Sequence, residues 1–417
     1  MFGHYKVLAR RYRPQRFQEV VEQTHTITAI ENAIKENRLG SAYLFYGPRG
    51  VGKTTIARIL AKRVNCLNPQ GVEPCNECES CKEITQGNSM DVIEIDAASN
   101  RRIEDVRELR ENVKFKPILG KKKVYIVDEV HMLTKESFNA LLKTLEEPPE
   151  HILFILATTE INKIPETILS RCQIFTFKKV PLLKLQKYLE EIAQKEKLKV
   201  EKEALFLIAK KGDGSVRDSL SFFEQVISYC DGEITASKVR ELMGSFHLDV
   251  FLDLLKRLFS ETSPDELLRP VVEIFNEGGD LERFLWEFLE FLRVAILIQK
   301  GVSDRDLLGL LGEEIEKIKQ VVKEIPFEKL SAVFEEIYQT RSKSYYLRIK
   351  NTFEARILME VVLLKLYDKL HKKSLEEILH DINQLTKAIE GKDISEEALF
   401  TKELNEELKK KSLIQKP

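Results

Sequence analysis

The 417-residue sequence lacks several features that would assign it to other classes of protein. No uncharged apolar run approaches the roughly 18 residues of a membrane-spanning helix, and the N-terminus has no apolar stretch like that of a signal peptide. We therefore expect a cytoplasmic protein without a membrane partner. The formal net charge of −1 excludes a globally basic nucleic-acid coat, so any DNA contact must come from local patches.

Repeats of fixed period and proline-rich linkers are also missing, although the chain is too long for one hydrophobic core. Residues 1–180 instead alternate short apolar runs, rich in β-forming residues, with amphipathic helical stretches. The runs lie at 43–46, 91–95, 124–127, 152–157 and 173–177. This alternation predicts an α/β domain in which helices surround a buried, five-stranded parallel sheet.

Strand-like runs disappear after Pro181. Residues 181–243 carry several helical patterns, one of which begins at Ser215 with the spacing of a capping box. A second helical region, with dense apolar stretches, extends over 244–370. Beyond it the chain is polar and only weakly amphipathic, so we expect a loosely packed helical tail over 371–417.

A phosphate-binding loop follows the first apolar run. Residues Gly47 to Thr54 read GPRGVGKT, which fits G-x-x-x-x-G-K-[ST], and they lie between a strand and a helix as this motif requires. The glycines allow backbone N–H groups to face the phosphates of ATP, Lys53 reaches the β- and γ-phosphates, and Thr54 binds Mg²⁺. The alternative is a chance glycine-rich turn.

Two acidic residues, Asp128 and Glu129, follow the run at 124–127. A carboxylate at the end of a buried strand is costly unless a cation or a donor meets it. Asp128 therefore suits the magnesium site, and Glu129 suits the polarisation of an attacking water. The pair predicts ATP hydrolysis rather than binding alone, and the alternative is two solvated acids at a strand exit.

A family resemblance extends over several motifs. The sequence contains GPRGVGKT, DEVHMLTKESFNALLKTLEEPPEH, LATTEINKIPETILSRC and GDGSVRDSLS. These stretches resemble the gamma/tau subunits of the bacterial DNA polymerase III clamp loader, which are AAA+ ATPases. The likeness covers about residues 5–245 and continues more faintly to about 370. It implies an AAA+ domain over 1–180, a helical lid over 181–243 and an all-α collar for oligomerisation over 244–370.

The resemblance also implies roles for individual residues. Thr159 resembles sensor 1, Arg217 resembles sensor 2, and Arg171 resembles an arginine finger that acts on ATP held by a neighbouring subunit. The segment LARRYRPQRFQEVVEQ resembles the part that surrounds the adenine, with Glu22 where the family usually has Gly. The alternative for either arginine is a surface salt bridge. The implied ATP-binding set is Ala9, Tyr12, Arg13, Pro14, Val20, Val21, Gly47, Arg49, Gly50, Val51, Gly52, Lys53, Thr54, Thr55 and Arg217.

Cysteine is scarce, with six residues in the chain, yet four of them have the spacing C-x8-C-x2-C-x2-C. They are Cys66, Cys75, Cys78 and Cys81. In a reduced cytoplasm clustered thiols favour a metal, and four thiolates give a closed, structural Zn²⁺ site over 66–81. This module also resembles one in the same family. Unliganded thiols and disulfides are the alternatives, and Cys172 and Cys230 are expected to be ordinary buried thiols.

DNA contacts are predicted at Asn100, Arg101, Arg102 and Lys143, where a solvated charged surface is the alternative. The resemblance implies an ATPase subunit that drives opening and loading of the sliding clamp on primed DNA, within the DNA polymerase III holoenzyme, a transferase. It implies as partners the delta and delta-prime subunits, further copies of this chain, the β sliding clamp and primed DNA. The polymerase core and the replicative helicase are candidate partners for the C-terminal region.

Two rival functions remain open. A Holliday-junction branch-migration motor belongs to the same superfamily, but Ser170-Arg171-Cys172 and the cysteine insertion disfavour it. A non-catalytic scaffold resembling delta-prime belongs to another functional class. The intact set Lys53, Thr54, Asp128 and Glu129 argues against a scaffold, because binding alone needs no residue that activates water.

Overall fold

The computed structural model describes residues 7–99, 111–244, 246–310, 312–347, 352–371, 379 and 382–385. The predicted DNA contacts Asn100, Arg101 and Arg102, and most of the predicted tail, lie outside these residues. The chain forms two compact units, Met1–Ser245 with Asp304–Leu311, and Phe246–Ser303 with Gly312–Pro417. Because the first unit contains both 1–180 and 181–243, the predicted division into three domains and a tail stays a prediction.

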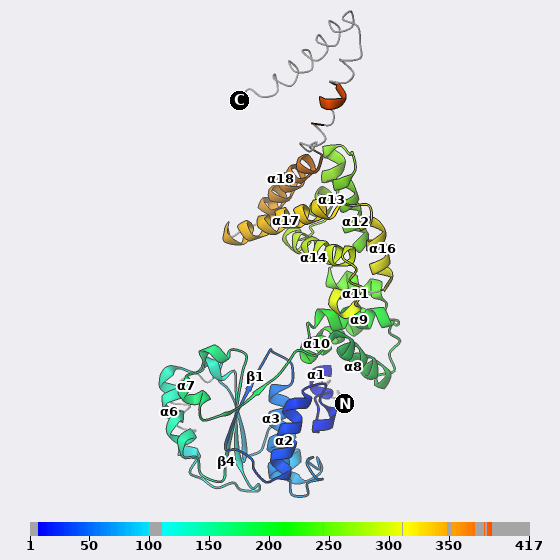
Figure 1. Cartoon of the computed structure of the whole chain (residues 1–417). Helices are drawn as coiled ribbons and strands as arrows, with labels where there is room; N and C mark the ends of the chain where they lie inside the picture. Colours follow the sequence, from blue (N-terminus) through cyan, green and yellow to red (C-terminus); the bar gives the residue numbers. More distant parts are fainter. Residues whose placement is uncertain are drawn as a thin grey trace, which may run out of the picture. The chain divides into compact units, whose positions relative to one another are not determined.

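The described part of the first unit contains a five-stranded parallel sheet, which confirms the predicted fold class (Figure 1). The strands are β1 (Ala42–Tyr46), β2 (Val92–Asp96), β3 (Lys123–Asp128), β4 (Ile152–Thr158) and β5 (Gln173–Thr176). Their order in the sheet is β2-β3-β4-β1-β5. Strand β4 therefore lies between β1 and β3, with Tyr46 beside Thr158 and Val127 beside Leu156. The carboxyl ends of these three strands meet at one edge, where open parallel sheets bind ligands.

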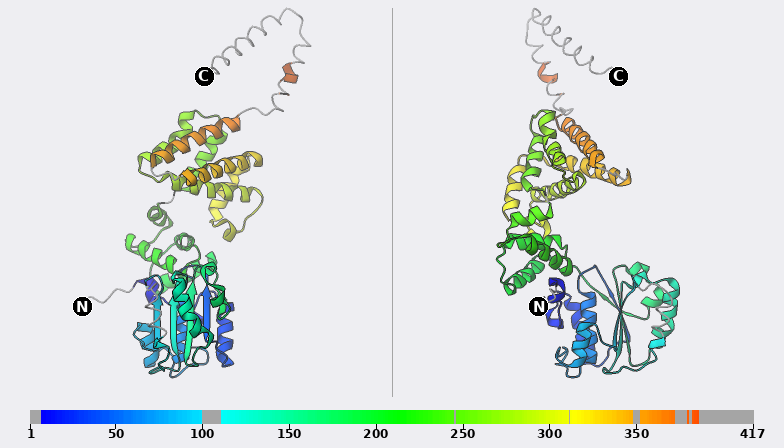
Figure 2. Two further views of the ribbon diagram at one scale, coloured as in Figure 1. Left: turned by 90° about the vertical axis from the view of Figure 1, so that its left-hand side faces the viewer. Right: turned by 180° about the vertical axis from the view of Figure 1, so that it is seen from behind.

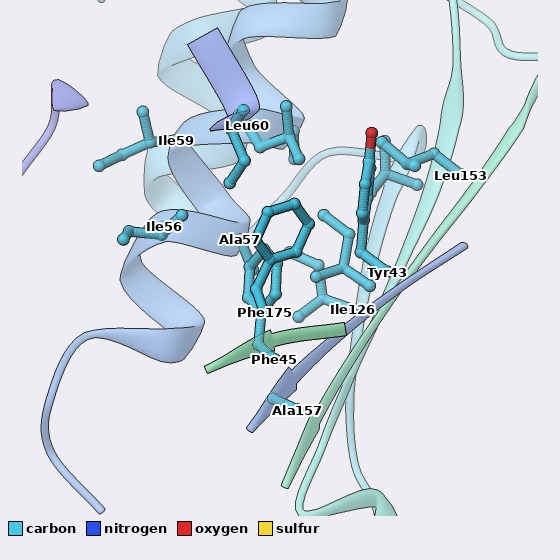
Figure 3. Packing of buried hydrophobic residues seen from close by; sticks show 14 of the residues in the cluster. Tyr43, Phe45, Ile56, Ala57, Ile59, Leu60, Ile126, Leu153, Ala157 and Phe175 are labelled. Atoms are coloured by element: carbon cyan, nitrogen blue, oxygen red, sulfur yellow. The ribbon is translucent and has the colours of Figure 1, made fainter. Parts of the chain in front are cut away.

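Helices cover both faces of this sheet (Figures 1 and 2). They are α2 (Thr24–Lys35) and α3 (Lys53–Asn65) on one face, and α6 (Lys135–Glu146) and α7 (Glu166–Leu169) on the other. Successive side chains of a strand point to opposite faces, so β1, β3 and β4 each contribute to two apolar cores. On the α3 side, Tyr43, Phe45 and Phe175 pack against Ile56 and Leu60 (Figure 3). Burial on both faces explains why these three strands read as nearly continuous apolar runs.

Four helices complete the main part of the first unit. They are α8 (Leu182–Lys195), α9 (Lys202–Lys211), α10 (Val216–Tyr229) and α11 (Ala236–Met243). Ser215 Oγ accepts a hydrogen bond from the Asp218 amide at 3.1 Å, which confirms the predicted helix start. The apolar faces of these helices share one core with Leu8 of the short N-terminal helix α1 (Leu8–Arg11). We call α8 to α11 the lid helices.

The second unit is helical throughout its described residues, as predicted for 244–370. Its helices are α12 (Leu248–Phe259), α13 (Pro264–Asn276), α14 (Leu281–Gln299), α16 (Gly312–Val322), α17 (Phe327–Leu347) and α18 (Thr352–His371). The ring of Phe251 in α12 packs against those of Phe284, Phe288 and Phe291 in α14. Among the described residues, none of the helices combines the length and apolar character needed to cross a membrane.

A buried carboxylate fixes the segment that leads into β3. Asp91 accepts a hydrogen bond from the Ile118 amide through Oδ1 at 2.6 Å. Its Oδ2 accepts from the amides of Leu119 and Gly120, both at 2.7 Å. Hydrogen bonds to an ionised acceptor are about twice as strong as neutral ones. Asp91 therefore sets the path of the chain into the strand that ends at Asp128.

We predict that Asp91→Ala destabilises the first unit by about 3 kcal/mol, because three amides lose a charged acceptor. The thermal midpoint of this unit should fall by roughly 6–12 °C, and hydrogen exchange at Ile118, Leu119 and Gly120 should accelerate. Asp231→Ala, at an exposed aspartate, is the matched control. Equal midpoints and equal exchange in the two variants would show that Asp91 does not anchor this segment.

Candidate nucleotide site and cysteine cluster

The loop between β1 and α3 makes two close approaches that exclude larger side chains. A Cβ atom on Gly47 would lie 2.4 Å from the carbonyl oxygen of Phe177. Gly50 has φ of 74°, and a Cβ atom there would lie 1.9 Å from Ser215 Oγ. Glycine alone combines this backbone conformation with this packing. The phosphate-binding loop is thus fitted against the first turn of α10 as well as the sheet.

Lys53, the first residue of α3, is buried with its charged end beside this loop. Its Nζ donates hydrogen bonds to the carbonyl oxygens of Gly47 and Pro48, both at 2.8 Å. Burial lowers the pKa of Lys53, and the carboxylates of Glu129 and Asp128 act in the opposite direction. An ammonium group has three donors, so one remains for an anionic oxygen.

Thr54 and Asp128 bring two oxygen ligands together from different elements. Thr54 Oγ1, in the first turn of α3, donates a hydrogen bond to Asp128 Oδ2, at the end of β3, over 2.6 Å. Hydroxyl and carboxylate oxygens are the hard ligands that Mg²⁺ prefers, and Mg²⁺ commonly takes only one or two protein carboxylates. The pair therefore fits a magnesium site.

Glu129 has an unusual backbone and a fixed carboxylate. Its φ of 48° lies in the left-handed region, which non-glycine residues rarely adopt. Glu129 Oε2 accepts a hydrogen bond from Thr159 Oγ1 at 3.2 Å and lies 3.4 Å from His131 Nδ1. The same His131 nitrogen lies 3.0 Å from Thr158 Oγ1. Strands β3 and β4 thus hold the carboxylate of Glu129 beside Thr159, the predicted sensor.

His131 is not among the site residues predicted from the sequence. Its buried ring bridges Glu129 and Thr158, and its Nε2 lies 3.3 Å from Glu160 Oε1. The only signal in the sequence is its place two residues after Glu129, in a short turn, η2 (Val130–Met132). A turn position does not reveal which strand end the ring will contact.

Arginine side chains from three segments gather near the start of α3. Burial lowers the pKa of Arg13, and the nearby positive charges of Arg58 and Arg217 lower it further. The negative charge of Glu94 acts in the opposite direction. Arg58 donates two hydrogen bonds to Glu94, at 2.7 and 2.8 Å. Arg217 has an exposed side chain, and its amide donates to the carbonyl oxygen of Gly50 at 3.3 Å. Clustered cations of this kind favour an anionic ligand.

The predicted adenine segment lies between the sheet and the lid helices. Ala9, Tyr12 and Val21 pack against the core of the lid helices, whereas Val20 packs against the core on the α3 face of the sheet. Glu22 has φ of 62°, a conformation that favours the glycine usual in the family, and its carboxylate pairs with Lys184 of α8. The other predicted residues are Pro14 in this segment, Arg49, Val51 and Gly52 in the loop, and Thr55 in the first turn of α3.

Arg171 lies just after α7 and is bound to its own side of the sheet. It donates hydrogen bonds to the carbonyl oxygen of Thr167 at 2.7 Å and to Glu146 Oε1 at 2.5 Å. About a third of its side chain is exposed (31%). Lys143, the described candidate for a DNA contact, is exposed on α6. The structure therefore groups Arg171 with α6 and α7, to which these hydrogen bonds join it.

The four clustered cysteines converge as the spacing predicts. Their sulfur atoms all lie within 4.8 Å of one another, with Cys66 and Cys75 at 3.4 Å and Cys75 and Cys81 at 4.0 Å. Tetrahedral Zn²⁺ with Zn–S bonds of about 2.3 Å separates its sulfurs by about 3.8 Å. The donor set and the spacing of the sulfurs therefore fit a closed zinc site.

Hydrogen bonds around Cys75 favour its thiolate. Burial raises the pKa of Cys75, but the amides of Glu77 and Cys78 and the neighbouring thiols outweigh burial and lower it to about 6. The two amides lie 3.5 and 3.4 Å from Cys75 Sγ. A thiolate is the form that binds metal. Cys172 and Cys230 are only half-buried, so the expectation that both are buried thiols is wrong. Burial raises the pKa of Cys172 to about 11.

Comparison with sequence families assigns each part of the chain. Residues 22–181 match a family described as DNA polymerase III, delta subunit. Residues 184–232 match the DNA polymerase III clamp loader subunit, ATPase lid domain. Residues 234–406 match DNA polymerase III subunits gamma and tau domain III.

Individual relatives agree with these families. The DNA polymerase III subunit tau/gamma of Haemophilus influenzae is 47% identical over 75% of this chain and 46% of its own length. The tau subunit of Bacillus subtilis is 38% identical over 95% of this chain and 69% of that protein. The gamma subunit of Buchnera aphidicola subsp. Baizongia pistaciae is 43% identical over 71% of this chain and 80% of that protein.

The matched region thus spans less than half of the Haemophilus influenzae relative. A solved structure of the T158V variant of Thermotoga maritima RuvB covers 75% of this chain and 90% of its own, with a TM-score of 0.44 and 18% identity. That likeness is too weak to bear on function. The family assignment rests on the sequence relatives. They show that the chain belongs to the family of DNA polymerase III gamma and tau subunits, which are AAA+ ATPases.

Proposed function

We propose that this chain is a clamp-loader subunit that binds and hydrolyses ATP to open the β sliding clamp and load it on primed DNA. The observation that carries this proposal is the Thr54–Asp128 hydrogen bond of 2.6 Å beside the Glu129–Thr159 pair at 3.2 Å. A site for binding alone needs no fixed carboxylate beside the phosphate-binding loop. Family membership supports delta and delta-prime subunits and further copies of this chain as partners.

Each residue of the site has a separate task in this proposal. Lys53 binds the β- and γ-phosphates, and Thr54 with Asp128 holds Mg²⁺, which neutralises phosphate charge when bound. Glu129 accepts a proton from the attacking water, and its hydrogen bond to Thr159 keeps the carboxylate aimed at the phosphate end. Arg217 reaches the phosphates from the lid, because its amide already bonds the loop at Gly50.

Other contacts of this subunit follow from exposed features. Arg171 acts on ATP bound by the next copy, since its guanidinium lies outside its own site and is partly exposed. Lys143 contacts the phosphate backbone of primed DNA together with Asn100, Arg101 and Arg102. The polymerase core and the replicative helicase bind the C-terminal region. We place the protein in the cytoplasm, where primed DNA is available.

The cysteine cluster binds Zn²⁺ as a structural site in this proposal. Cys66, Cys75, Cys78 and Cys81 supply four thiolates, which leave no coordination position open for a substrate. Within the described chain, the residues between α3 and α4 (Glu79–Gln86) form no helix or strand of their own, apart from a bridge between Gln70 and Glu73. A metal therefore replaces the apolar core that so short an insertion cannot build.

We expect Glu129→Gln to bind ATP normally but to hydrolyse it roughly 10²–10⁴-fold more slowly, because the shape is kept and the base is lost. Lys53→Ala should instead weaken ATP binding itself. Binding of a fluorescent ATP analogue and phosphate release, measured with the partner subunits, clamp and primed DNA, separate the two effects. Glu203→Gln, at an exposed position of α9, is the control. Parental turnover in Glu129→Gln would show that Glu129 does not activate the water. A parent chain without turnover in the same assay would instead favour a scaffold subunit.

Arg171→Ala should leave the ATP affinity of the isolated chain intact, yet lower DNA-stimulated hydrolysis in the assembled complex by roughly 10³–10⁵-fold. Mixing Arg171→Ala with Lys53→Ala should partly restore hydrolysis, because an intact Arg171 then meets an intact phosphate site. Arg38→Ala, at an exposed arginine, should have no effect. A mixture that stays inactive despite verified co-assembly would assign Arg171 to its ion pair with Glu146.

Purified chain should contain about one Zn²⁺, and Cys78→Ser should lower metal content and local stability because one of four ligands is lost. Metal analysis by mass spectrometry and proteolysis between α3 and α4 test the two effects. Cys230→Ser is the matched control, since Cys230 lies outside the cluster. Zinc-free protein from a preparation without chelator would rule out the site.

A further inference from the structure

The loop that carries the cysteines contacts the N-terminal segment directly. Residues 15–18 lie within the predicted adenine segment, between its predicted binding residues Ala9, Tyr12, Arg13 and Pro14 on one side and Val20 and Val21 on the other. Glu19 Oε2 accepts hydrogen bonds from the amides of Gln15 and Arg16, at 2.7 and 3.3 Å. These local bonds leave the next two amides for a more distant acceptor.

That acceptor is Glu73, in the cysteine loop. Glu73 Oε2 accepts from the Phe17 amide at 2.9 Å, and Glu73 Oε1 accepts from the Gln18 amide at 3.0 Å. Both oxygens of one carboxylate thus bind consecutive amides at the start of the short turn η1 (Phe17–Glu19). Charged acceptors form the stronger class of hydrogen bond, so the contact constrains the backbone as well as touching it.

A second link joins the same loop to Gln15 through a buried lysine. Lys62 of α3 is 2% exposed, and its Nζ donates to Gln15 Oε1 at 2.7 Å and to Asn76 Oδ1 at 2.6 Å. The ammonium also donates to the Gln15 carbonyl oxygen at 3.1 Å. A buried charge requires such partners, because an unpaired ammonium would be expensive in the interior. Lys62 therefore holds Gln15 and Asn76 in one fixed arrangement.

Both links begin next to a cysteine ligand. Glu73 precedes Cys75 by two residues, and Asn76 follows it directly with φ of 64°. The turn that carries Glu73 is fixed by paired backbone hydrogen bonds between Gln70 and Glu73, at 2.9 and 3.0 Å. Arg63 of α3 donates to the carbonyl oxygen of Gly71 in that turn, at 2.9 and 2.6 Å. The position of Cys75 thus determines where Glu73 and Asn76 can reach.

We propose that Glu73 is a positioning residue for the base of the nucleotide, and that the metal-bound cysteine loop holds the adenine segment in its binding conformation through Glu73 and Asn76. The inference rests on the proposed ATP function of the site. The segment reaches the base only from a defined backbone path, and the Glu73 carboxylate fixes that path at Phe17 and Gln18. The phosphate-binding loop is held separately by the sheet and by α10, so phosphate affinity does not depend on Glu73.

The test compares base and phosphate binding in the full chain. Glu73→Ala should bind ATP on the order of tenfold more weakly, through loss of two charged hydrogen bonds, while its affinity for inorganic tripolyphosphate stays within about twofold. Hydrogen exchange at the Phe17 and Gln18 amides should accelerate in the same variant. Glu77→Ala removes the same charge from an exposed position of the same loop and should match the parent in all three measurements.

Asn76→Gly provides a second variant that keeps the left-handed backbone while removing the side chain that Lys62 and Gln15 contact. It should weaken ATP binding severalfold without a change in tripolyphosphate binding. Glu73→Gln keeps one acceptor and should lie between parent and Glu73→Ala. Metal removal, with chelator separated before Mg²⁺ is added, should weaken ATP binding of the parent as Glu73→Ala does. Chelation should have little further effect on Glu73→Ala, because the link is already broken.

Three results would overturn the inference. If the parent binds ATP and Glu73→Ala binds it with the same affinity, the adenine segment does not need its hydrogen bonds to Glu73. Equal losses for ATP and tripolyphosphate would indicate general destabilisation of the unit. Additive effects of chelation and Glu73→Ala would separate the metal from this carboxylate. A parent chain that binds tripolyphosphate but has no preference for ATP would instead contradict the proposed function, and with it the role given to the base.

Discussion

The hydrogen bond between Thr54 and Asp128 joins residues 74 positions apart in the sequence, and the nucleotide site depends on it. Thr54 lies in the first turn of the helix after β1, and Asp128 ends β3. Strand β4 lies between β1 and β3, and it places its last residue, Thr158, and the following Thr159 at the same edge. Another strand order would separate the phosphate-binding loop from the acids, although every motif in the sequence would be unchanged. The parallel sheet is thus the constraint that turns separate motifs into one site.

Local signals predict the elements of this fold well. Apolar runs predict all five strands, most clearly β1, β3 and β4, which are buried on both faces. The serine at 215 predicts a helix start that its side chain caps. The phosphate-binding loop and the cysteine spacing are also local patterns, which makes them readable without a structure. The roles of Thr159, Arg171 and Arg217 came from family resemblance, since an isolated threonine or arginine has many uses on a protein surface.

Contacts between distant segments could not be predicted in this way. Strand order does not follow from apolar periodicity, and the position of His131 between two strand ends depends on that order. Glu73 binds backbone amides, which every residue except proline presents, so no partner sequence marks the contact. The half-exposed state of Cys172 and Cys230 likewise depends on which helices cover them, because cysteine itself is often fully buried.

The close approach of Gly50 to Ser215 has a consequence for how this protein can change over time. A methyl group on Gly50 would overlap the serine hydroxyl, which itself caps α10. A larger residue in the loop therefore requires a smaller one at the helix start, and that replacement removes the cap. Substitutions at these two positions are therefore coupled. Among related chains, we expect positions 50 and 215 to be retained together or to covary. The phosphate-binding loop and the lid helix α10 are thus expected to evolve as a coupled pair.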